Sequence, residues 1–181
     1  MKYPIGIQSF DRIMEDGYVY VDKTDLIFRL THEGSIYFLS RPRRFGKSLL
    51  VSTLENYYLG RKELFRGLAI DSLETEWAVH PVFHVDFNGG NFTNPGELEQ
   101  KISFYLTEWE QQYGLPVRMN ELGYGDRFIQ VLETAHRQTG RRAVVLVDEY
   151  DKPILDVLDV DTSLEERHRN VLKAFYSVFK G

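Results

Sequence analysis

The sequence of 181 residues contains no cysteine, which excludes disulfide bonds and thiolate chemistry and suits a reducing compartment. It also lacks any apolar run near the ~20 residues needed to span a bilayer, and residues 1–6 lack the apolar core of a signal peptide. Basic residues are fewer than acidic ones, 22 against 27, and the net charge of -5 disfavours a protein that coats nucleic acid nonspecifically. We therefore expect a cytoplasmic protein with no membrane segment.

The apolar and aromatic residues, 43% and 14% of the sequence, are enough to form one domain with a full core over residues 1–181. Short apolar runs alternate with helical patterns, which is typical of a parallel sheet covered by helices on both faces. We expect strands at residues 18–21, 36–40, 82–87 and 143–147. The predicted fold class is therefore α/β, and residues 1–34 form a lead-in of helix and strand before the strand at 36–40.

Capping residues mark where the helices of this fold are expected to begin. Ser9 can cap the first helix, and Asn94 followed by a proline can cap another. Asp126 is the expected cap of a third helix, and Ser163 with Glu166 forms a capping box for the last one. These residues place helices between the expected strands, as the α/β pattern requires.

Residues 36–48 read IYFLSRPRRFGKS and contain the most informative pattern in the chain. A short apolar strand is followed by a basic turn and then by Gly46-Lys47-Ser48 at the expected start of a helix. This arrangement is typical of a nucleoside triphosphate site, in which backbone N–H groups and the positive helix end meet the phosphates. Lys47 would reach the β/γ oxygens, and the Ser48 hydroxyl would ligate Mg2+.

One position departs from the general phosphate-binding loop, which reads Gly, four residues and then Gly-Lys-Ser/Thr. Arg41 stands where that pattern has its first glycine, so the chain enters the turn differently or the guanidinium itself acts there. Arg43 and Arg44 add positive charge in the fork geometry that suits phosphate. We expect the nucleotide contacts from eight residues: Arg41, Arg43, Arg44, Phe45, Gly46, Lys47, Ser48 and Leu49.

An acidic segment supplies the other half of the same chemistry. Asp148 follows an apolar strand at its carboxyl tip, where open α/β sheets bind ligands, and would hold Mg2+ directly or through water. Glu149 would orient and deprotonate the attacking water. Asp151 either supports this acidic pair or caps the next helix. Asp86, at the tip of another expected strand, either lies near the nucleotide or a partner, or caps its own loop.

Four motifs, in order along nearly the whole chain, resemble the bacterial AAA-ATPase-like family: YPIGIQSF at residues 3–10, YVDKT at 20–24, LSRPRRFGKS at 39–48 and VDEYDKP at 147–153. The arginine-rich loop is the form that this family carries, so Arg41 departs from the general pattern but not from the family. The resemblance implies a P-loop NTPase fold of three α/β/α layers with a mainly parallel sheet. It also implies ATP and Mg2+ as cofactors, with Lys47 and Ser48 at the phosphates and with Asp148 and Glu149 as the acidic pair.

Members of that family usually continue into a further sheet strand and then a nuclease-like domain. The resemblance therefore implies that this chain lacks the later strands of its sheet. The next strand would lie between those at 36–40 and 143–147, and without it the sheet has unpaired edges. We expect the chain to be a fragment, a truncated product, or a subunit that pairs with another copy of itself.

Two functions of different class are consistent with these residues. The first is Mg-dependent ATP hydrolysis that drives a conformational change, with Lys47 and the arginines stabilising phosphate charge and Glu149 activating water. The second is a nucleotide-binding switch or scaffold with little turnover, which regulates an attached or partner effector such as a nuclease. Nucleic-acid binding through the arginine loop is a third, which the acidic net charge disfavours. The sequence does not distinguish ATP from GTP or identify the effector.

Overall fold

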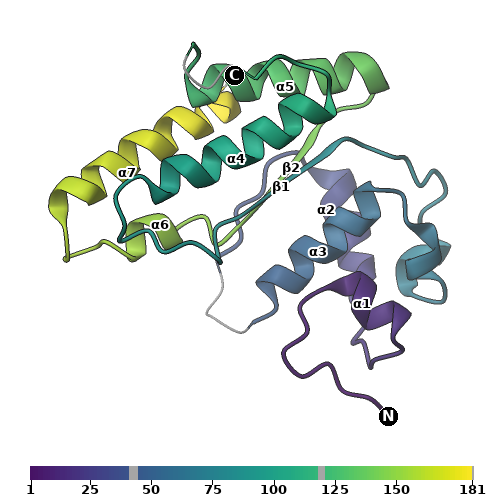
Figure 1. Cartoon of the computed structure of the whole chain (residues 1–181). Helices are drawn as coiled ribbons and strands as arrows, with labels where there is room; N and C mark the ends of the chain where they lie inside the picture. The colour runs from purple at the N-terminus through teal and green to yellow at the C-terminus, as the bar shows by residue number, and fades with distance from the viewer. Residues whose placement is uncertain (41–44, 118–120, 181) are drawn as a thin grey trace. The chain divides into compact units, whose positions relative to one another are not determined.

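The computed structural model describes residues 1–40, 45–117 and 121–180, and it divides into two compact units, Met1–Val82 and Phe83–Gly181 (Figure 1). The described residues form a mixed α/β structure that is mostly helical, with one two-stranded parallel sheet. None of the helices in these ranges is both long and apolar enough to cross a bilayer. Each unit buries apolar side chains of its own.

The described part of unit Met1–Val82 is built from helices: α1 (Phe10–Glu15), α2 (Thr24–Glu33), α3 (Lys47–Tyr58) and the 3-10 helices η1 (Lys62–Phe65) and η2 (Ala69–Ser72). Helix α1 packs against α3, where the Phe10 N–H donates to the Ser52 hydroxyl at 2.9 Å. Phe10 and Phe65 are fully buried, and their ring centroids lie 4.7 Å apart. These contacts fix the position of α3, the helix that begins in the Gly-Lys-Ser motif.

Asp22 joins three segments of this unit. One of its carboxylate oxygens accepts hydrogen bonds from the Thr24 N–H and hydroxyl, at 2.9 and 2.7 Å. The other oxygen accepts the Ala69 N–H at 2.7 Å, while the Thr24 hydroxyl accepts the Ile70 N–H at 3.0 Å. Burial raises the pKa of Asp22, but these hydrogen bonds together outweigh it, so the pKa lies below its ordinary value of 3.8.

The second unit contains the sheet and the longer helices: β1 (Val82–Asp86), α4 (Glu97–Gln112), α5 (Tyr124–Thr139), β2 (Val144–Asp148), α6 (Lys152–Leu155), α7 (Thr162–Phe175) and η3 (Tyr176–Lys180). Strand β1, whose first residue precedes the unit boundary, is the hydrogen-bonded neighbour of β2. Helices α4, α5 and α7 lie together on one side of this sheet (Figure 1).

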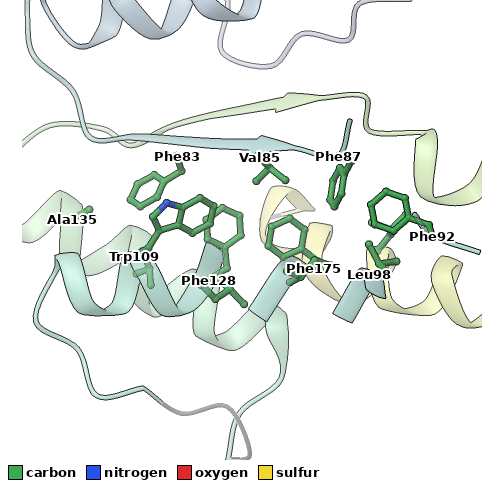
Figure 2. Close-up of a cluster of buried hydrophobic side chains, with 13 residues drawn as sticks. Phe83, Val85, Phe87, Phe92, Leu98, Trp109, Phe128, Ala135 and Phe175 are labelled. Carbon is green, nitrogen blue, oxygen red and sulfur yellow. The ribbon is translucent and has the colours of Figure 1, made fainter. Parts of the chain in front are cut away.

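Alternation along the two strands decides which side chains face these helices. Three fully buried side chains of the β1 segment point toward the aromatic residues of the helices (Figure 2): Phe83, Val85 and Phe87. Val145 and Val147 of β2 pack against the same core. The alternate residues of β2 therefore face the opposite side of the sheet, and Asp148 is one of them.

The first turn of α5 passes close to the end of α7 at Gly125. A β-carbon at Gly125 would lie 2.7 Å from the Ala174 carbonyl oxygen and 2.6 Å from Ser177 Oγ, which is too close for any side chain. Two residues along, Arg127 makes a bidentate ion pair with Glu110 of α4, at 2.7 and 2.8 Å, and both side chains are almost fully buried. The glycine contact and the ion pair together fix α5 against its two neighbouring helices.

Two of the four expected strands are confirmed, and two are wrong. The strands expected at 82–87 and 143–147 exist as β1 and β2, each within one residue of its predicted ends. Residues 18–21 and 36–40 form no strand, so the lead-in over 1–34 contains α1 and α2 instead of helix and strand. An apolar run becomes a strand only beside a chain that satisfies its N–H and C=O groups. Neither segment belongs to the sheet of the described residues, which consists of β1 and β2, and the Val19 N–H donates instead to the Lys2 carbonyl at 2.8 Å.

Of the four expected helix caps, only Ser9 is confirmed, and only in its position. Helix α1 begins after Ser9 as predicted, but the Ser9 hydroxyl bonds the Asp11 carboxylate and not a backbone N–H. Helix α7 begins after Asp161, whose carboxylate accepts the Leu164 N–H at 2.9 Å. The capping box at Ser163 is therefore wrong, because the acid two residues upstream already occupies the capping position.

The remaining two starts are also displaced by a few residues. Helix α4 begins after Gly96, which has a left-handed backbone, and not directly after Asn94. Helix α5 begins after Gly123, so Asp126 lies in its first turn and does not cap it. An acid in the first turn still favours the helix start electrostatically, which explains why the pattern located α5 without identifying its cap.

Candidate functional site

Helix α3 begins at the glycine of the Gly-Lys-Ser motif, which confirms the predicted helix start. Gly46 is the N-cap residue and has a left-handed backbone, with φ 72° and ψ 26°, that other residues disfavour. Lys47 and Ser48 follow as the first two helical residues and are half-buried. The first hydrogen bond of the helix runs from the Leu50 N–H to the Gly46 carbonyl at 3.0 Å. The N–H groups before Leu50 therefore have no acceptor within the helix.

The first turn of α3 contains no acidic residue, and Gly46 has no side chain that could cap it. Five other helices have an Asp or Glu in the first turn: α1, α2, α4, α5 and α7. An acid at that place neutralises the partial positive charge of a helix start and competes for its N–H groups. Its absence leaves the start of α3 suited to an external anion such as a phosphate.

Side-chain hydrogen bonds along α3 stabilise the turn that follows its start. The Thr53 hydroxyl donates to the Leu49 carbonyl at 2.7 Å, and the Asn56 side chain donates to the Ser52 carbonyl at 2.8 Å. Arg61 Nη1 donates in turn to Asn56 Oδ1 at 3.1 Å. Thr53 and Asn56 are buried with these bonds made, so we expect the start of α3 to be formed before any ligand binds.

The acidic pair lies at the carboxyl end of β2. Asp148 is the last residue of the strand and is only 7% exposed. Glu149 follows with a left-handed backbone, φ 52°, which is unusual for a residue with a side chain. The Glu149 N–H donates to Asp148 Oδ1 at 3.0 Å, and the Lys152 N–H donates to the Glu149 carbonyl at 3.0 Å. Strained backbone of this kind is concentrated at functional sites, where the surrounding structure enforces it.

The turn after Glu149 contacts two side chains that sequence reasoning missed. Asp151 occupies the N-cap position of α6, but its side chain makes no capping hydrogen bond. Burial of Tyr176, with the negative charge of Asp151 as a smaller cause, raises the pKa of that phenol above its ordinary value. His168 Nδ1 lies 2.8 Å from the Pro153 carbonyl oxygen. Neither Tyr176 nor His168 belongs to a recognisable motif, so no local pattern could have indicated them.

The end of β1 lies beside the end of β2, where the Phe87 N–H donates to the Asp148 carbonyl at 3.3 Å. Asp86 Oδ1 accepts the Asn88 N–H at 2.7 Å, which confirms the loop cap that was one of the two interpretations of Asp86. The Tyr105 hydroxyl of α4 donates to the Asp86 carbonyl at 3.1 Å. Hydrogen bonds among β1, β2 and α4 therefore hold the carboxyl edge of the sheet at Asp148.

The predicted site residues fall into two groups, which belong to different units. Phe45, Gly46, Lys47, Ser48 and Leu49 are consecutive at the start of α3, where Phe45 is 64% exposed. Asp148 and Glu149 are consecutive at the end of β2. Arg41, Arg43 and Arg44 lie outside the described residues. A single site formed by Lys47, Ser48, Asp148 and Glu149 stays a prediction.

Comparison with known proteins gives two matches. A family model described as Predicted AAA-ATPase matches residues 4–181. The chain is similar to a curated protein of Azotobacter chroococcum mcd 1 named "Uncharacterized protein in vnfD 5'region", with 45% identity over 181 residues that cover 99% of this chain and 34% of that protein. The chain thus spans about a third of the length of this relative. No solved structure matches the chain.

Proposed function

The chain belongs to the family of predicted AAA-ATPases, and from that premise we propose that it binds ATP and hydrolyses it with Mg2+, coupling hydrolysis to a conformational change. The observation that carries the proposal is the start of α3. There a left-handed glycine, a lysine and a serine open a helix of 12 residues whose first turn has no acidic residue. Backbone N–H groups, the Lys47 ammonium and the Arg41, Arg43 and Arg44 guanidinium groups would together bind the triphosphate.

The residues present also fit a divalent cation. Mg2+ prefers oxygen ligands and keeps water or phosphate oxygens in its coordination shell. The Ser48 hydroxyl and the Asp148 carboxylate are such ligands, and within the described ranges no three His, Asp or Glu side chains form a metal cage of their own. Bound Mg2+ would neutralise charge on the phosphate oxygens. Glu149 would accept a proton from the water that attacks the γ-phosphate.

We also propose that residues 1–181 form a single P-loop domain of three α/β/α layers, in which β1 and β2 are two strands of a mainly parallel sheet. The parallel pair β1-β2 and the layer formed by α4, α5 and α7 support this architecture. Asp148 at the carboxyl tip of β2 is then at the sheet edge where α/β folds bind ligands.

A second function is a nucleotide-binding switch with little turnover that regulates an effector. The length of the curated relative favours it, because about two thirds of that protein lies outside the aligned region. An attached nuclease-like domain, a separate partner protein or a second copy of the chain could be the effector. In this case nucleotide binding at α3 would matter and proton abstraction by Glu149 would not.

Steady-state ATP turnover of the full-length protein separates the two functions. The variant Glu149→Gln keeps the shape of the side chain and removes the general base. We expect its kcat to fall by about 10²–10⁴-fold, the usual contribution of such a base, with Mg-ATP affinity retained. Glu133→Gln, an exposed position on α5, is the matched control and should leave kcat unchanged. Equal inactivity of wild type and Glu149→Gln, with ATP bound by both, would reject hydrolysis in favour of the switch.

A further inference from the structure

A buried histidine connects the loop of the acidic pair to α7. His168 is 0% exposed, and its Nδ1 lies 2.8 Å from the carbonyl oxygen of Pro153 in α6. A carbonyl oxygen only accepts, so Nδ1 must carry the hydrogen. Helices α6 and α7 pack against each other (Figure 1). The bond from His168 joins the single turn of α6 to the middle of α7.

Apart from this bond, the His168 ring lies in buried, apolar surroundings. Nε2 is buried and has no hydrogen-bond partner among the described residues. The ring packs edge-on against Phe92, with centroids 6.4 Å apart. Among the described residues, the His168 side chain therefore has one hydrogen bond, the one to Pro153.

Backbone hydrogen bonds of the residues on either side of Pro153 run back to Glu149 and Asp151. The Lys152 N–H donates to the Glu149 carbonyl at 3.0 Å, and the Leu155 N–H donates to the Asp151 carbonyl at 3.0 Å. These bonds make residues 149–155 one compact turn. Because Glu149 has an unfavourable left-handed backbone, the turn keeps its form only if neighbouring structure holds it. The bond from His168 is a contact of this kind, from a different element.

We propose that His168 is a positioning residue: its Nδ1–H bond to Pro153 holds the turn 149–155 against α7 and so keeps the Glu149 carboxylate in place. The inference rests on the proposed function for its catalytic consequence, but not for its structural one. Lys152 supports the same turn, since its ammonium pairs with Asp156 Oδ2 at 2.5 Å and lies 5.4 Å from the centre of the Phe92 ring.

Hydrogen–deuterium exchange tests the structural part without any nucleotide. His168→Asn keeps an N–H donor at the position of Nδ1, whereas His168→Phe fills the ring volume without a donor. We expect the amides of Lys152 and of residues 154–156 to exchange about tenfold faster in His168→Phe, the factor that matches one lost hydrogen bond, and near the wild-type rate in His168→Asn. His136→Phe is the matched control, because His136 Nδ1 makes a bond of the same 2.8 Å to the Arg141 carbonyl. It should leave residues 152–156 unchanged.

ATP turnover tests the catalytic part. We expect kcat to fall about tenfold in His168→Phe and to recover in His168→Asn, with the KM for Mg-ATP unchanged in both. If His168→Phe does not fold, His168→Gln, whose amide lies at the position of Nε2, takes its place. Unaltered exchange in the turn, or equal loss of kcat in the Asn and Phe variants, would overturn the role of His168. Faster exchange in a protein whose wild type has no turnover would instead overturn only the proposed hydrolysis.

Discussion

Because the backbone of Glu149 is left-handed, we predict an unusual order of stability for two variants at this position: Glu149→Gly should be more stable than Glu149→Ala. Glycine is normally about 0.5–1 kcal/mol less stable than alanine within a structured segment, because it loses more backbone entropy on folding. At φ 52° a β-carbon costs about 1–2 kcal/mol, since it approaches the following carbonyl oxygen. Glu149→Ala keeps that cost, and Glu149→Gly removes it. The central values of these two effects differ by about 0.75 kcal/mol, and the glycine variant should be more stable than the alanine variant by about this amount.

Equilibrium urea unfolding measures this difference. Trp109 lies in the core of the second unit, so its fluorescence, with Trp77 replaced by Phe, reports on the unit that contains Glu149. The same Ala and Gly pair at Glu133, exposed within α5, is the control and should show the ordinary order, with alanine more stable by about 1 kcal/mol. Both variants at position 149 lack the carboxylate, so their difference isolates the backbone. An alanine variant as stable as the glycine variant, or more so, refutes the assignment of strain.

Three further results are expected. Asp161→Ala removes the side chain that caps α7 and should lower the free energy of unfolding by about 1 kcal/mol. Ser163→Ala, at the cap that the sequence pattern favours, should change the free energy of unfolding by less than about 0.5 kcal/mol. Urea titration of the two variants measures both values. Gly125→Ala should destabilise the second unit despite the better helix propensity of alanine, because its β-carbon would meet the α7 backbone, and Gly89→Ala, with open space around it, should be neutral in thermal melts. The folded-state pKa of Asp22 is lowered, so the stability that its carboxylate contributes is fully present above the unfolded pKa near 4 and is lost as the pH falls through the folded pKa. Asp22→Asn should therefore weaken the fall in stability of the first unit as the pH drops below about 4, and an unchanged fall in urea titrations at these pH values would contradict this.

Patterns in the sequence predicted those features of the fold that depend on residues close together in the chain. The sequence placed a helix start at Gly46 and strands ending near Asp86 and Asp148, because glycine, apolar runs and turn residues act within a few positions. It therefore identified both halves of the candidate site as segments of the chain. The left-handed backbone of Glu149 had no such signature, because nothing in the residue type favours it.

Contacts between distant segments were beyond the same reasoning. The run at 36–40 has the composition of a buried strand, but strand formation depends on a pairing partner that composition does not reveal. His168 bonds a carbonyl 15 positions away, and Tyr176 is affected by the charge of Asp151. Residue type alone could not show that Asp161 and not Ser163 caps α7, since both residue types are good caps.

The most direct test of the account is nucleotide binding by Lys47 at the start of α3. Thermal unfolding is followed with Mg-ATP, Mg-GTP and ADP for the wild type, for Lys47→Ala and for the control Lys62→Ala, an exposed lysine of the same unit. At a hundredfold excess over Kd, we predict that Mg-ATP stabilises the wild type and Lys62→Ala by about 2.7 kcal/mol and leaves Lys47→Ala unshifted. Equal stabilisation of all three proteins, or of none, would contradict a phosphate site at this helix.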